Sequence, residues 1–131
     1  MNKEPCPFCD PLHWDIATET ELSYSRWDKY PVSKGHTLIV PKRHFSNYFE
    51  ATDEELLDLW EMVKERQYLF QLKFNPDGFN IGINIGEAAG QTISHLHIHL
   101  IPRYKGDMKD PRGGVRGVIP EKQKYEQVSE S

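Results

Sequence analysis

The chain has no long hydrophobic run, and this absence limits the classes of protein to which it can belong. Hydrophobic residues make up 37% of its 131 positions, and no segment approaches the roughly 18 consecutive apolar residues of a membrane span. The first five residues, Met1 to Pro5, lack the apolar core of a secretion signal. We therefore expect a cytoplasmic protein with no membrane partner.

A strong charge of one sign is also missing. The 16 Lys and Arg residues and 20 Asp and Glu residues leave a formal net charge of −4. This balance argues against a protein that coats nucleic acid or another polyanion, so any phosphate binding must come from a local arrangement of side chains. The length suits one domain with its own core.

Cysteine is scarce, since Cys6 and Cys9, in Cys6-Pro7-Phe8-Cys9, are the only two. A redox dithiol needs a strand before the pair, and only five residues precede Cys6. The pair could instead be half of a tetrahedral zinc site, whose other ligands would have to be histidines. Two thiols without a role are the third possibility. The candidate histidines are His13, His36, His44, His95, His97 and His99.

Histidine, in contrast, is concentrated in one place. Three of the six histidines lie in His95-Leu96-His97-Ile98-His99, within the segment from Gln91 to Pro102. Strict alternation of polar and apolar residues is typical of a half-buried strand, so the three imidazoles should share one face while the apolar residues anchor the other.

Three interpretations of this row of imidazoles remain open. The side chains could be solvated on an outer face, although histidine is an unusual choice there. They could converge on one catalytic metal ion, because positions i, i+2 and i+4 of a strand lie close together. In the third interpretation one histidine is a nucleophile, and its neighbours orient it and the leaving group.

The pattern of histidines alternating with apolar residues, followed by two apolar residues and preceded by Gly90-Gln91-Thr92, resembles the signature of the histidine triad (HIT) family of nucleotide hydrolases and transferases. The resemblance extends from Cys6 to about Arg103. It implies a domain over residues 1–105, followed by a separate C-terminal tail.

The resemblance also implies a role for each histidine of the row. The middle one, His97, would attack the α-phosphorus and form a covalent nucleotidyl-histidine. His99 would lie beside the leaving oxygen, and His95 would support the geometry of the strand. Neutral imidazole suits such an attack because it is uncharged and still nucleophilic near pH 7.

In the zinc-bearing branch of the family, the metal ligands match four residues of this chain. They are Cys6, Cys9, His44 and His95. The resemblance therefore implies a structural zinc ion that joins the N-terminus to the histidine strand.

Substrate-binding residues follow partly from the resemblance and partly from side-chain chemistry. The resemblance assigns Asp28 to the ribose hydroxyls and His36 to the wall near the phosphates. It places Phe8, Trp27 and Ile39 in a base pocket, although each could equally be a core residue. Gln91, Thr92 and Asn84 could donate hydrogen bonds to phosphoryl oxygens.

The rest of the sequence predicts an α+β fold. A capping box at Thr52-Asp53-Glu54-Glu55 predicts a helix that ends near Phe74. Alternating or short apolar segments predict strands near 22–27, 37–41, 79–85 and 95–102, giving an antiparallel sheet with one long helix packed on it. Because the helix is apolar on more than one side, we expect it to contact a partner in a homodimer, as the resemblance also implies.

The C-terminal tail, residues 106–131, is rich in loops and basic residues. Between Arg103 and Tyr125, seven basic and three acidic residues give a local charge of +4. Arg112 and Arg116 flank paired glycines and could hold a phosphate, since guanidinium groups offer two parallel donors. A solvated tail without contacts is the alternative.

The resemblance to the HIT family implies a nucleotide hydrolase or nucleotidyl transferase that acts at the α-phosphate. The tail resembles that of prokaryotic HIT proteins that process dinucleoside polyphosphates, which implies a substrate such as diadenosine tetraphosphate. The alternatives among enzymes are adenylyl transfer to inorganic phosphate, as in a phosphorylase, and hydrolysis of nucleoside phosphoramidates. A zinc-stabilised nucleotide-binding module without turnover is the alternative of another class.

Overall fold

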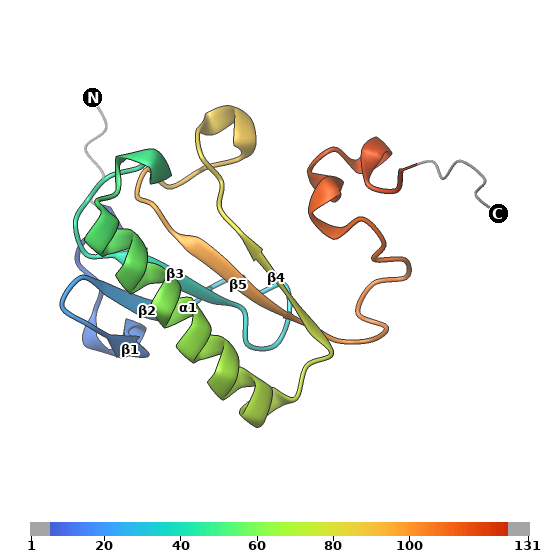
Figure 1. Cartoon of the computed structure of the whole chain (residues 1–131), viewed down its shortest axis with the longest axis horizontal. Helices are drawn as coiled ribbons and strands as arrows, with labels where there is room; N and C mark the ends of the chain where they lie inside the picture. The colour runs from blue at the N-terminus through green and yellow to red at the C-terminus, as the bar shows by residue number, and fades with distance from the viewer. Residues whose placement is uncertain (1–5, 126–131) are drawn as a thin grey trace.

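In the computed structural model, which describes residues 6–125, five strands form one antiparallel sheet in the order β1-β2-β3-β5-β4 (Figure 1). The strands are β1 (Thr18–Glu19), β2 (Ser23–Trp27), β3 (Thr37–Pro41), β4 (Gly78–Gly82) and β5 (Ile98–Arg103). Within these residues the single α-helix is α1 (Asp53–Phe74), and the 3-10 helices are η1 (His13–Asp15), η2 (Tyr48–Glu50), η3 (Glu87–Ala89), η4 (Gly114–Val118) and η5 (Pro120–Lys122). The predicted α+β fold class is confirmed.

Helix α1 begins at the capping box that the sequence predicts. The Thr52 hydroxyl accepts a hydrogen bond from the Glu55 amide (3.0 Å), and the Glu55 carboxylate accepts one from the Thr52 amide (2.8 Å). Arg43 adds two hydrogen bonds to the same carboxylate. The helix ends at Phe74, and its C-cap residue Asn75 adopts a left-handed conformation (φ 50°) that few residues other than glycine and asparagine tolerate.

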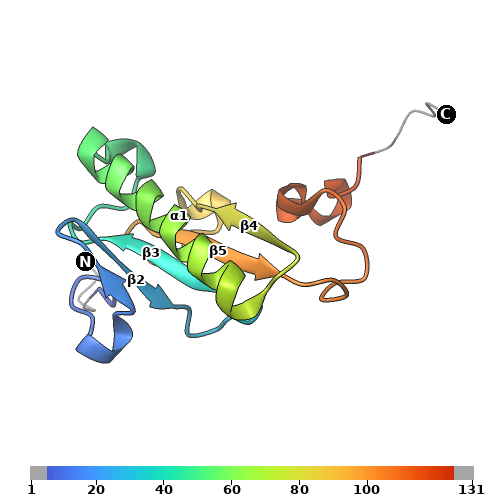
Figure 2. The same ribbon diagram turned by 60° about the horizontal axis from the view of Figure 1, so that its bottom comes forward.

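The two faces of the sheet pack against different parts of the chain. Helix α1 covers one face, where Ile39, Ile98 and Leu100 meet Leu59 and Val63 (Figures 1 and 2). On the opposite face, Phe8 of the N-terminal segment packs with Tyr24, Leu38 and Val40. Because side chains alternate along a strand, neighbours such as Leu38 and Ile39 belong to different cores.

The histidine segment enters the sheet later than its alternation predicts. Strand β5 begins at Ile98 rather than at His95, because the amide of Leu96 donates to the carbonyl oxygen of Phe45 (2.7 Å) in the loop after β3. Leu96, Ile98 and Leu100 are nevertheless fully buried. The alternation therefore predicts burial correctly even where the strand ladder has not begun.

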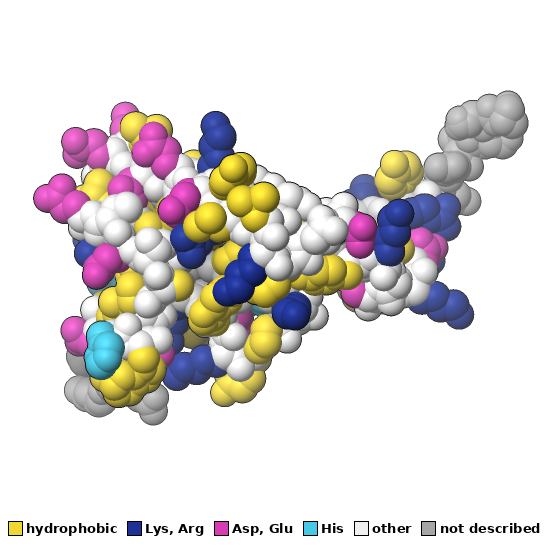
Figure 3. All heavy atoms as spheres, turned by 90° about the horizontal axis from the view of Figure 1, so that it is seen from below, with side chains coloured by type: hydrophobic (Ala, Val, Ile, Leu, Met, Phe, Trp, Pro, Cys, Tyr) yellow, Lys and Arg dark blue, Asp and Glu magenta, His cyan; other side chains and the backbone are white. Residues whose placement is uncertain are grey.

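After β5 the chain leaves the sheet and forms a small unit of η4 and η5 beside the edge strand β4 (Figure 1). Gly113 allows the two short helices to close, since a Cβ atom there would lie 1.8 Å from the carbonyl oxygen of Gln123. Lys and Arg side chains are prominent on this unit, whereas Asp and Glu gather at the far end of the molecule (Figure 3). Across residues 6–125, no helix combines the length and the hydrophobicity needed to span a membrane.

Candidate active site

A cavity of about 540 Å³ opens on the sheet face opposite α1. Its volume lies in the range of small-molecule binding sites. Strands β2, β3 and β5, the N-terminal segment and the loop before β5 all contribute to its wall. The lining residues include Phe8, Arg26, Trp27, Asp28, His36, Leu38, Asn84, Thr92, Ile93, His97 and His99.

His97 lines this cavity with one ring nitrogen fixed by the backbone. Its Nδ1 lies 2.9 Å from the carbonyl oxygen of His95. A carbonyl oxygen can only accept, so Nδ1 must carry the ring proton. In neutral His97, the unprotonated nitrogen is consequently Nε2, which has the lone pair a nucleophile needs. The ring also packs edge-on against Phe8, with 5.1 Å between centroids.

His99 meets His36 and Asp28 at the other side of the cavity. Nδ1 of His99 lies 3.0 Å from Nε2 of His36 and 4.0 Å from the Asp28 carboxylate, and that carboxylate lies 3.3 Å from Nε2 of His36. Asp28 is further held by the amide of Tyr30, which donates to its other oxygen (2.7 Å). The three side chains therefore form one polar cluster beside the nucleophile candidate.

Burial keeps the imidazoles of the cavity uncharged near neutral pH. It lowers the pKa of His36 and of His97, in both cases against the opposing effect of Asp28. Burial, with the nearby His97 and His36, lowers the pKa of His99 to about 4. Neutral rings suit nucleophilic attack and hydrogen bonding to phosphate rather than permanent binding of an anion.

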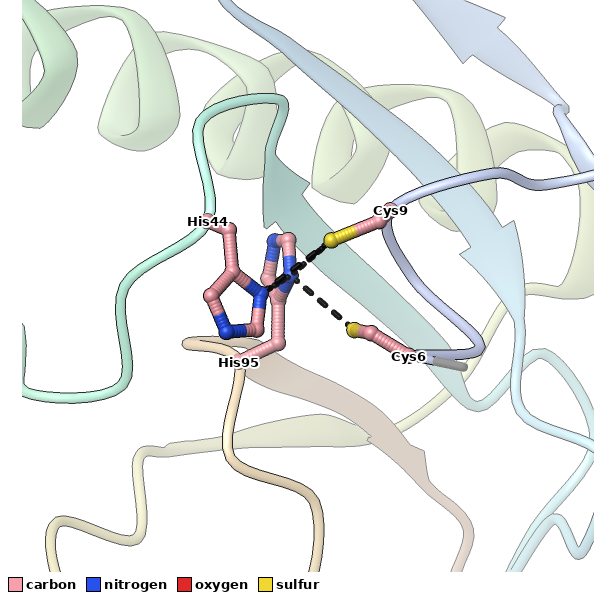
Figure 4. Close-up of side chains that lie close together, drawn as sticks. All are labelled: Cys6, Cys9, His44 and His95. Carbon is pink, nitrogen blue, oxygen red and sulfur yellow. Dashed lines mark hydrogen bonds between the residues drawn. The ribbon is translucent and has the colours of Figure 1, made fainter. Parts of the chain in front are cut away.

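His95 lies outside the cavity, in a second cluster with Cys6, Cys9 and His44 (Figure 4). Nε2 of His95 donates to the carbonyl oxygen of Pro41 (2.8 Å), so its Nδ1 has the lone pair. That nitrogen lies 3.3 Å from Sγ of Cys6, 3.6 Å from Sγ of Cys9 and 3.1 Å from Nδ1 of His44.

The donors of this cluster fit a tetrahedral zinc ion. Zinc bonds of about 2.0–2.3 Å to nitrogen and sulfur place neighbouring ligand atoms about 3.3 to 3.8 Å apart. The four donor atoms lie within 4.8 Å of one another, and Nδ1 of His44 is 3.1 Å from Sγ of Cys9. A cation would bond the lone pair at Nδ1 of His95, which points at the other three donors.

The alternative of a metal centre made by all three histidines is wrong for this structure. His95 directs its Nδ1 to the Cys6–Cys9 cluster, whereas His97 uses its Nδ1 on a backbone carbonyl. In the described part of the chain, neither group of residues spaced to hold a metal includes His97. The central imidazole is therefore left to the cavity.

Six of the ten predicted substrate-binding residues line the cavity. They are Phe8, Trp27, Asp28, His36, Asn84 and Thr92. Trp27 lies at the rim, where its ring stacks on Phe70 of α1 with 5.5 Å between centroids. The structure thus brings together segments that are far apart in the sequence.

The placement of Ile39 in the base pocket is wrong. Ile39 is fully buried beneath α1, and its neighbour Leu38 lines the cavity instead. The strand pairing explains this, because Leu38 lies opposite His99 whereas Ile39 lies opposite Ile98. A shift of one position along a strand moves a side chain to the other face of the sheet.

Gln91 also differs from the prediction of a phosphate donor. Its amide nitrogen donates to the carbonyl oxygens of Ser46 (3.1 Å) and Ile93 (3.2 Å), and its side-chain oxygen accepts from the amide of Gly86 (2.8 Å). These bonds hold the loop before β5 in place. Gln91 therefore lies beside the histidine-lined cavity without lining it.

The two tail arginines do not line the cavity either. Arg112 forms hydrogen bonds with the Asp110 carboxylate at 3.1 and 3.0 Å. The guanidinium of Arg116 lies over the ring of Tyr125, 5.0 Å from its centroid. Both cations are thus engaged by partners within the tail.

Several lining residues were absent from the sequence prediction. Apolar Val32, Leu38 and Ile93 face the cavity together with charged Arg26 and Lys29. Strand parity, counted from the histidines, could have indicated Leu38. Nothing in the local sequence distinguishes Arg26, which is almost fully buried and donates to the carbonyl oxygen of Pro7 (3.2 Å).

A family model described as the HIT domain matches residues 13–106. The chain belongs to the HIT family. It is similar to a HIT-like protein of Methanocaldococcus jannaschii, with 40% identity over 106 residues that span 78% of this chain and 81% of the relative. As a HIT protein it is a nucleotide hydrolase or transferase, a class that includes the enzymes named next.

Some of the relatives carry enzyme names. The chain is 40% identical over 96 residues to the bis(5'-adenosyl)-triphosphatase of Dictyostelium discoideum, covering 73% of this chain and 64% of that protein. It is 33% identical over 93 residues to the AP-4-A phosphorylase of Mycobacterium tuberculosis, covering 70% of this chain and 48% of that protein.

Solved structures of HIT proteins share the fold. A hypothetical histidine triad nucleotide-binding protein from Sulfolobus tokodaii superposes with a TM-score of 0.72 at 41% identity, over 80% of this chain and 73% of that one. A zinc-bound histidine triad family protein from Mycobacterium smegmatis gives a TM-score of 0.70 at 31% identity, over 81% and 83%.

Proposed function

We propose that this HIT protein cleaves dinucleoside polyphosphates at the α-phosphate through a covalent intermediate on His97. The observation that carries the proposal is the ring of His97, which lines the cavity with Nδ1 bonded to the carbonyl oxygen of His95 and Nε2 available for attack. The names of the Dictyostelium and Mycobacterium tuberculosis relatives support this class of substrate.

The cavity offers a complementary surface for one nucleoside. Phe8, Leu38 and Ile93 provide an apolar wall for a base. Asp28 can accept hydrogen bonds from ribose hydroxyls, although one of its oxygens already accepts from Tyr30. Such a nucleoside would place its α-phosphorus near His97.

The reaction then takes two steps. The lone pair at Nε2 of His97 forms a bond to phosphorus while the bond to the leaving oxygen breaks, and the electron pair leaves with that oxygen beside His99. Thr92 and Asn84 can donate hydrogen bonds to the phosphoryl oxygens. In the second step water attacks the phosphorus, the phosphorus–nitrogen bond breaks with its electron pair returning to Nε2 of His97, and a mononucleotide is released. Attack by inorganic phosphate in place of water releases a nucleoside diphosphate.

Trapping the intermediate tests the proposal. Diadenosine tetraphosphate labelled at the α-phosphate is mixed with the protein and quenched in alkali, which preserves phosphoramidates, and the label is located by mass spectrometry. We expect adenylate on His97. Label on another residue, or turnover without any labelled protein, would contradict it. Parallel reactions with and without phosphate separate hydrolysis from phosphorolysis, because only phosphorolysis yields ADP from the adenylyl group.

We further propose that the cluster of Cys6, Cys9, His44 and His95 holds a structural zinc ion. Zinc would cross-link the N-terminal segment, the loop after β3 and the histidine segment, which approach one another here in the fold (Figure 4). The zinc-bound homologue of Mycobacterium smegmatis supports this proposal. The chemistry of the donors supports it as well, since two thiols and two imidazoles favour zinc.

We also propose that two copies of the chain associate through the outer face of α1. That face exposes large apolar side chains, among them Leu57, Trp60, Tyr68, Leu69 and Leu72. Exposed apolar groups lie across the middle of the molecule (Figure 3). A second copy would cover them. Sedimentation equilibrium should show a dimer that Trp60→Glu weakens. Lys109→Glu, a change of charge at an exposed position of the tail, should leave the dimer unchanged. A monomeric wild-type protein would refute the proposal.

A further inference from the structure

Arg26 is a buried cation in the mainly apolar part of the cavity wall. The residue is only 3% exposed, yet it lines the cavity together with Phe8, Leu38 and Ile93. Its guanidinium carbon lies 5.1 Å from the centroid of the Phe8 ring. Burying a charge among apolar side chains is costly unless the charge is hydrogen-bonded, so the five N–H groups of this guanidinium should meet acceptors.

The protein supplies acceptors for only some of these N–H groups. Nη1 donates to the carbonyl oxygen of Pro7 (3.2 Å). Nη2 lies 3.6 Å from Oδ1 of Asp15, beyond hydrogen-bond range, and the other oxygen of Asp15 accepts from the amide of Leu12 (3.1 Å). The Tyr24 phenol is a further neighbour, because burial raises its pKa and the guanidinium of Arg26 opposes that rise.

This inventory leaves donors for a ligand. Even if Pro7, Asp15 and Tyr24 each accepted one N–H group, two of the five would have no acceptor among the described residues. Arg26 lines the cavity and is otherwise buried, so an atom bound in the cavity can reach these donors. Two parallel N–H groups suit a ligand with two adjacent acceptors.

The pairing of the strands places Arg26 at a defined distance from the histidines. Arg26 of β2 lies opposite Leu38 of β3, which lies opposite His99 of β5. Neighbouring strands are ~4.8 Å apart, so the backbones of Arg26 and His99 are roughly 10 Å apart across the sheet. A purine nucleotide bridges a distance of this order between the edge of its base and its α-phosphate. With the phosphate beside the histidines, the edge of the base therefore meets Arg26.

Guanine and adenine present different groups to such a cation. Guanine has two acceptors on one edge, O6 and N7, and their spacing matches two parallel N–H groups of arginine. Adenine has N7 but carries an amino group in place of O6, so a donor would face a donor. In a buried site this mismatch leaves both groups without partners, which costs more than it does in water.

We propose that Arg26 binds the O6/N7 edge of guanine, so that the cavity selects guanosine nucleotides over adenosine nucleotides. The preferred substrate is then a dinucleoside polyphosphate with at least one guanosine. The inference rests on the proposed function for the position of the phosphate beside His97, whereas the choice of base is measured by binding alone. The hydrogen bond to Pro7 suits this role, because it holds the guanidinium in place before a ligand arrives.

Calorimetric titration of the purified protein with mononucleotides tests the choice of base. We expect guanosine monophosphate to bind about 5- to 150-fold more tightly than adenosine monophosphate, the range for one bidentate contact of arginine with the correct base. Equal affinities for the two purines would overturn the proposal. Tighter binding of adenosine monophosphate or of uridine monophosphate than of guanosine monophosphate would overturn it as well.

Changes to the base locate the contact without altering the protein. Inosine monophosphate keeps O6 and N7 and lacks the 2-amino group, so it should bind nearly as tightly as guanosine monophosphate. The 7-deazaguanosine nucleotide lacks N7 and the 2-aminopurine nucleotide lacks O6, so each should lose most of the preference. If inosine monophosphate bound no better than adenosine monophosphate, the preference would come from the 2-amino edge and not from Arg26.

Variants at Arg26 test the cation itself. Arg26→Met keeps a long side chain without donors, and Arg26→Lys keeps the charge without the planar pair of donors. We expect both variants to bring the ratio of the guanosine and adenosine affinities close to one, while adenosine monophosphate still binds and shows that the cavity is intact. A guanosine preference that persists in Arg26→Met would refute the role of Arg26.

The control is Lys109→Gln, which removes a positive charge from an exposed position of the tail outside the cavity. This variant should keep the wild-type ratio of affinities. A loss of the ratio in Lys109→Gln would mean that overall charge, and not the contact with Arg26, determines the preference. The series of bases in the wild-type protein decides the question even where a variant fails to fold.

Turnover separates this inference from the proposed reaction. Wild-type protein should cleave diguanosine tetraphosphate with a higher kcat/KM than diadenosine tetraphosphate, and Arg26→Met should cleave the two about equally. If guanosine monophosphate binds more tightly but no nucleotide is trapped on His97, the proposed reaction is wrong and the selection of guanine stands. If a nucleotide is trapped on His97 while both purines bind equally, the reaction stands and the role of Arg26 is wrong.

Discussion

The Cys–His cluster and the histidine-lined cavity use histidines that are two residues apart, and the two histidines differ in which ring nitrogen has the lone pair. At His95 the Nε2–H donates a hydrogen bond to the carbonyl oxygen of Pro41, so the lone pair that a metal would bond is on Nδ1. At His97 the Nδ1–H donates to the carbonyl oxygen of His95, so the lone pair is on Nε2. Identical side chains thus acquire different chemistry from the backbone carbonyl that each one meets.

This contrast explains how a run of alternating histidines can serve two purposes. Each ring has one proton to donate when neutral, and the backbone determines where that proton lies. Histidine allows either ring nitrogen to have the lone pair, and the surrounding backbone determines which one does. Variants at the Cys–His cluster and at the cavity test this difference, starting with the largest expected effect.

Replacing His97 should affect the reaction and leave metal binding by the Cys–His cluster intact. His97→Ala removes the nucleophile, so we expect kcat to fall at least ~10³-fold, equivalent to about 4 kcal/mol of activation free energy. Single-turnover kinetics with diadenosine tetraphosphate measure the loss. Zinc content and nucleotide affinity should remain near wild type, and hydrolysis at the wild-type rate would remove His97 from the mechanism.

Replacing Cys9 should instead affect metal binding and stability. Cys9→Ser weakens one ligand, and we expect zinc affinity to fall more than ~100-fold, since loss of even an outer-shell partner of a metal ligand costs about 10- to 100-fold. The melting temperature should fall with it. Metal analysis after dialysis against a chelator checks the first effect and calorimetry the second.

The control for Cys9 is Asp10→Ser, a change at the adjacent exposed position. This variant should keep its metal and its melting temperature. If wild-type protein purified without added metal contains no zinc and is as stable as the zinc-loaded form, the cluster is not a structural metal site.

Leu38 and Ile39 provide a second comparison, across the two faces of β3. Ile39→Ala leaves a hole in the core beneath α1, and we expect it to reduce the free energy of unfolding by about 2–5 kcal/mol. Leu38→Ala removes part of the cavity wall, so it should weaken binding of adenosine monophosphate more than Ile39→Ala does. Urea unfolding and calorimetric titration measure the pair. If Ile39→Ala weakened nucleotide binding more than Leu38→Ala does, Ile39 would belong to the base pocket after all.

The sequence predicts this fold well where local signals are strong. The capping box at Thr52 and the period-two burial of Leu96, Ile98 and Leu100 are both found in the structure. The same signals could not tell Leu38 from Ile39, because every residue of a strand buried on both faces is apolar or small. Face assignment there depends on the pairing of β3 with β5, which the sequence of β3 alone does not contain.

Predictions about the site were likewise correct for some residues and wrong where contacts between distant segments decide. The resemblance assigned Asp28 and His36 to the substrate, side-chain chemistry added Thr92, and the structure places all three around one cavity. The sequence could not show that the side-chain amide of Gln91 donates to backbone carbonyl oxygens, because the carbonyl of Ser46 lies in a different loop. It also could not assign tautomers, which depend on carbonyl groups such as those of Pro41 and His95.

The smallest effect is expected in the tail, which differs from the cavity in having partners for its charged groups. Arg112 is paired with Asp110, and Arg116 lies over Tyr125, with both guanidinium groups outside the catalytic cavity. We expect Arg112→Ala and Arg116→Ala each to change kcat/KM by no more than about twofold, as exposed substitutions usually do. A loss of tenfold or more, with the dimer and the melting temperature unchanged, would mean that a tail arginine reaches the phosphates.

In a dimer that arginine could come from the second copy. Mixing Arg116→Ala protein with His97→Ala protein would reveal this, since only mixed dimers would then contain one complete site.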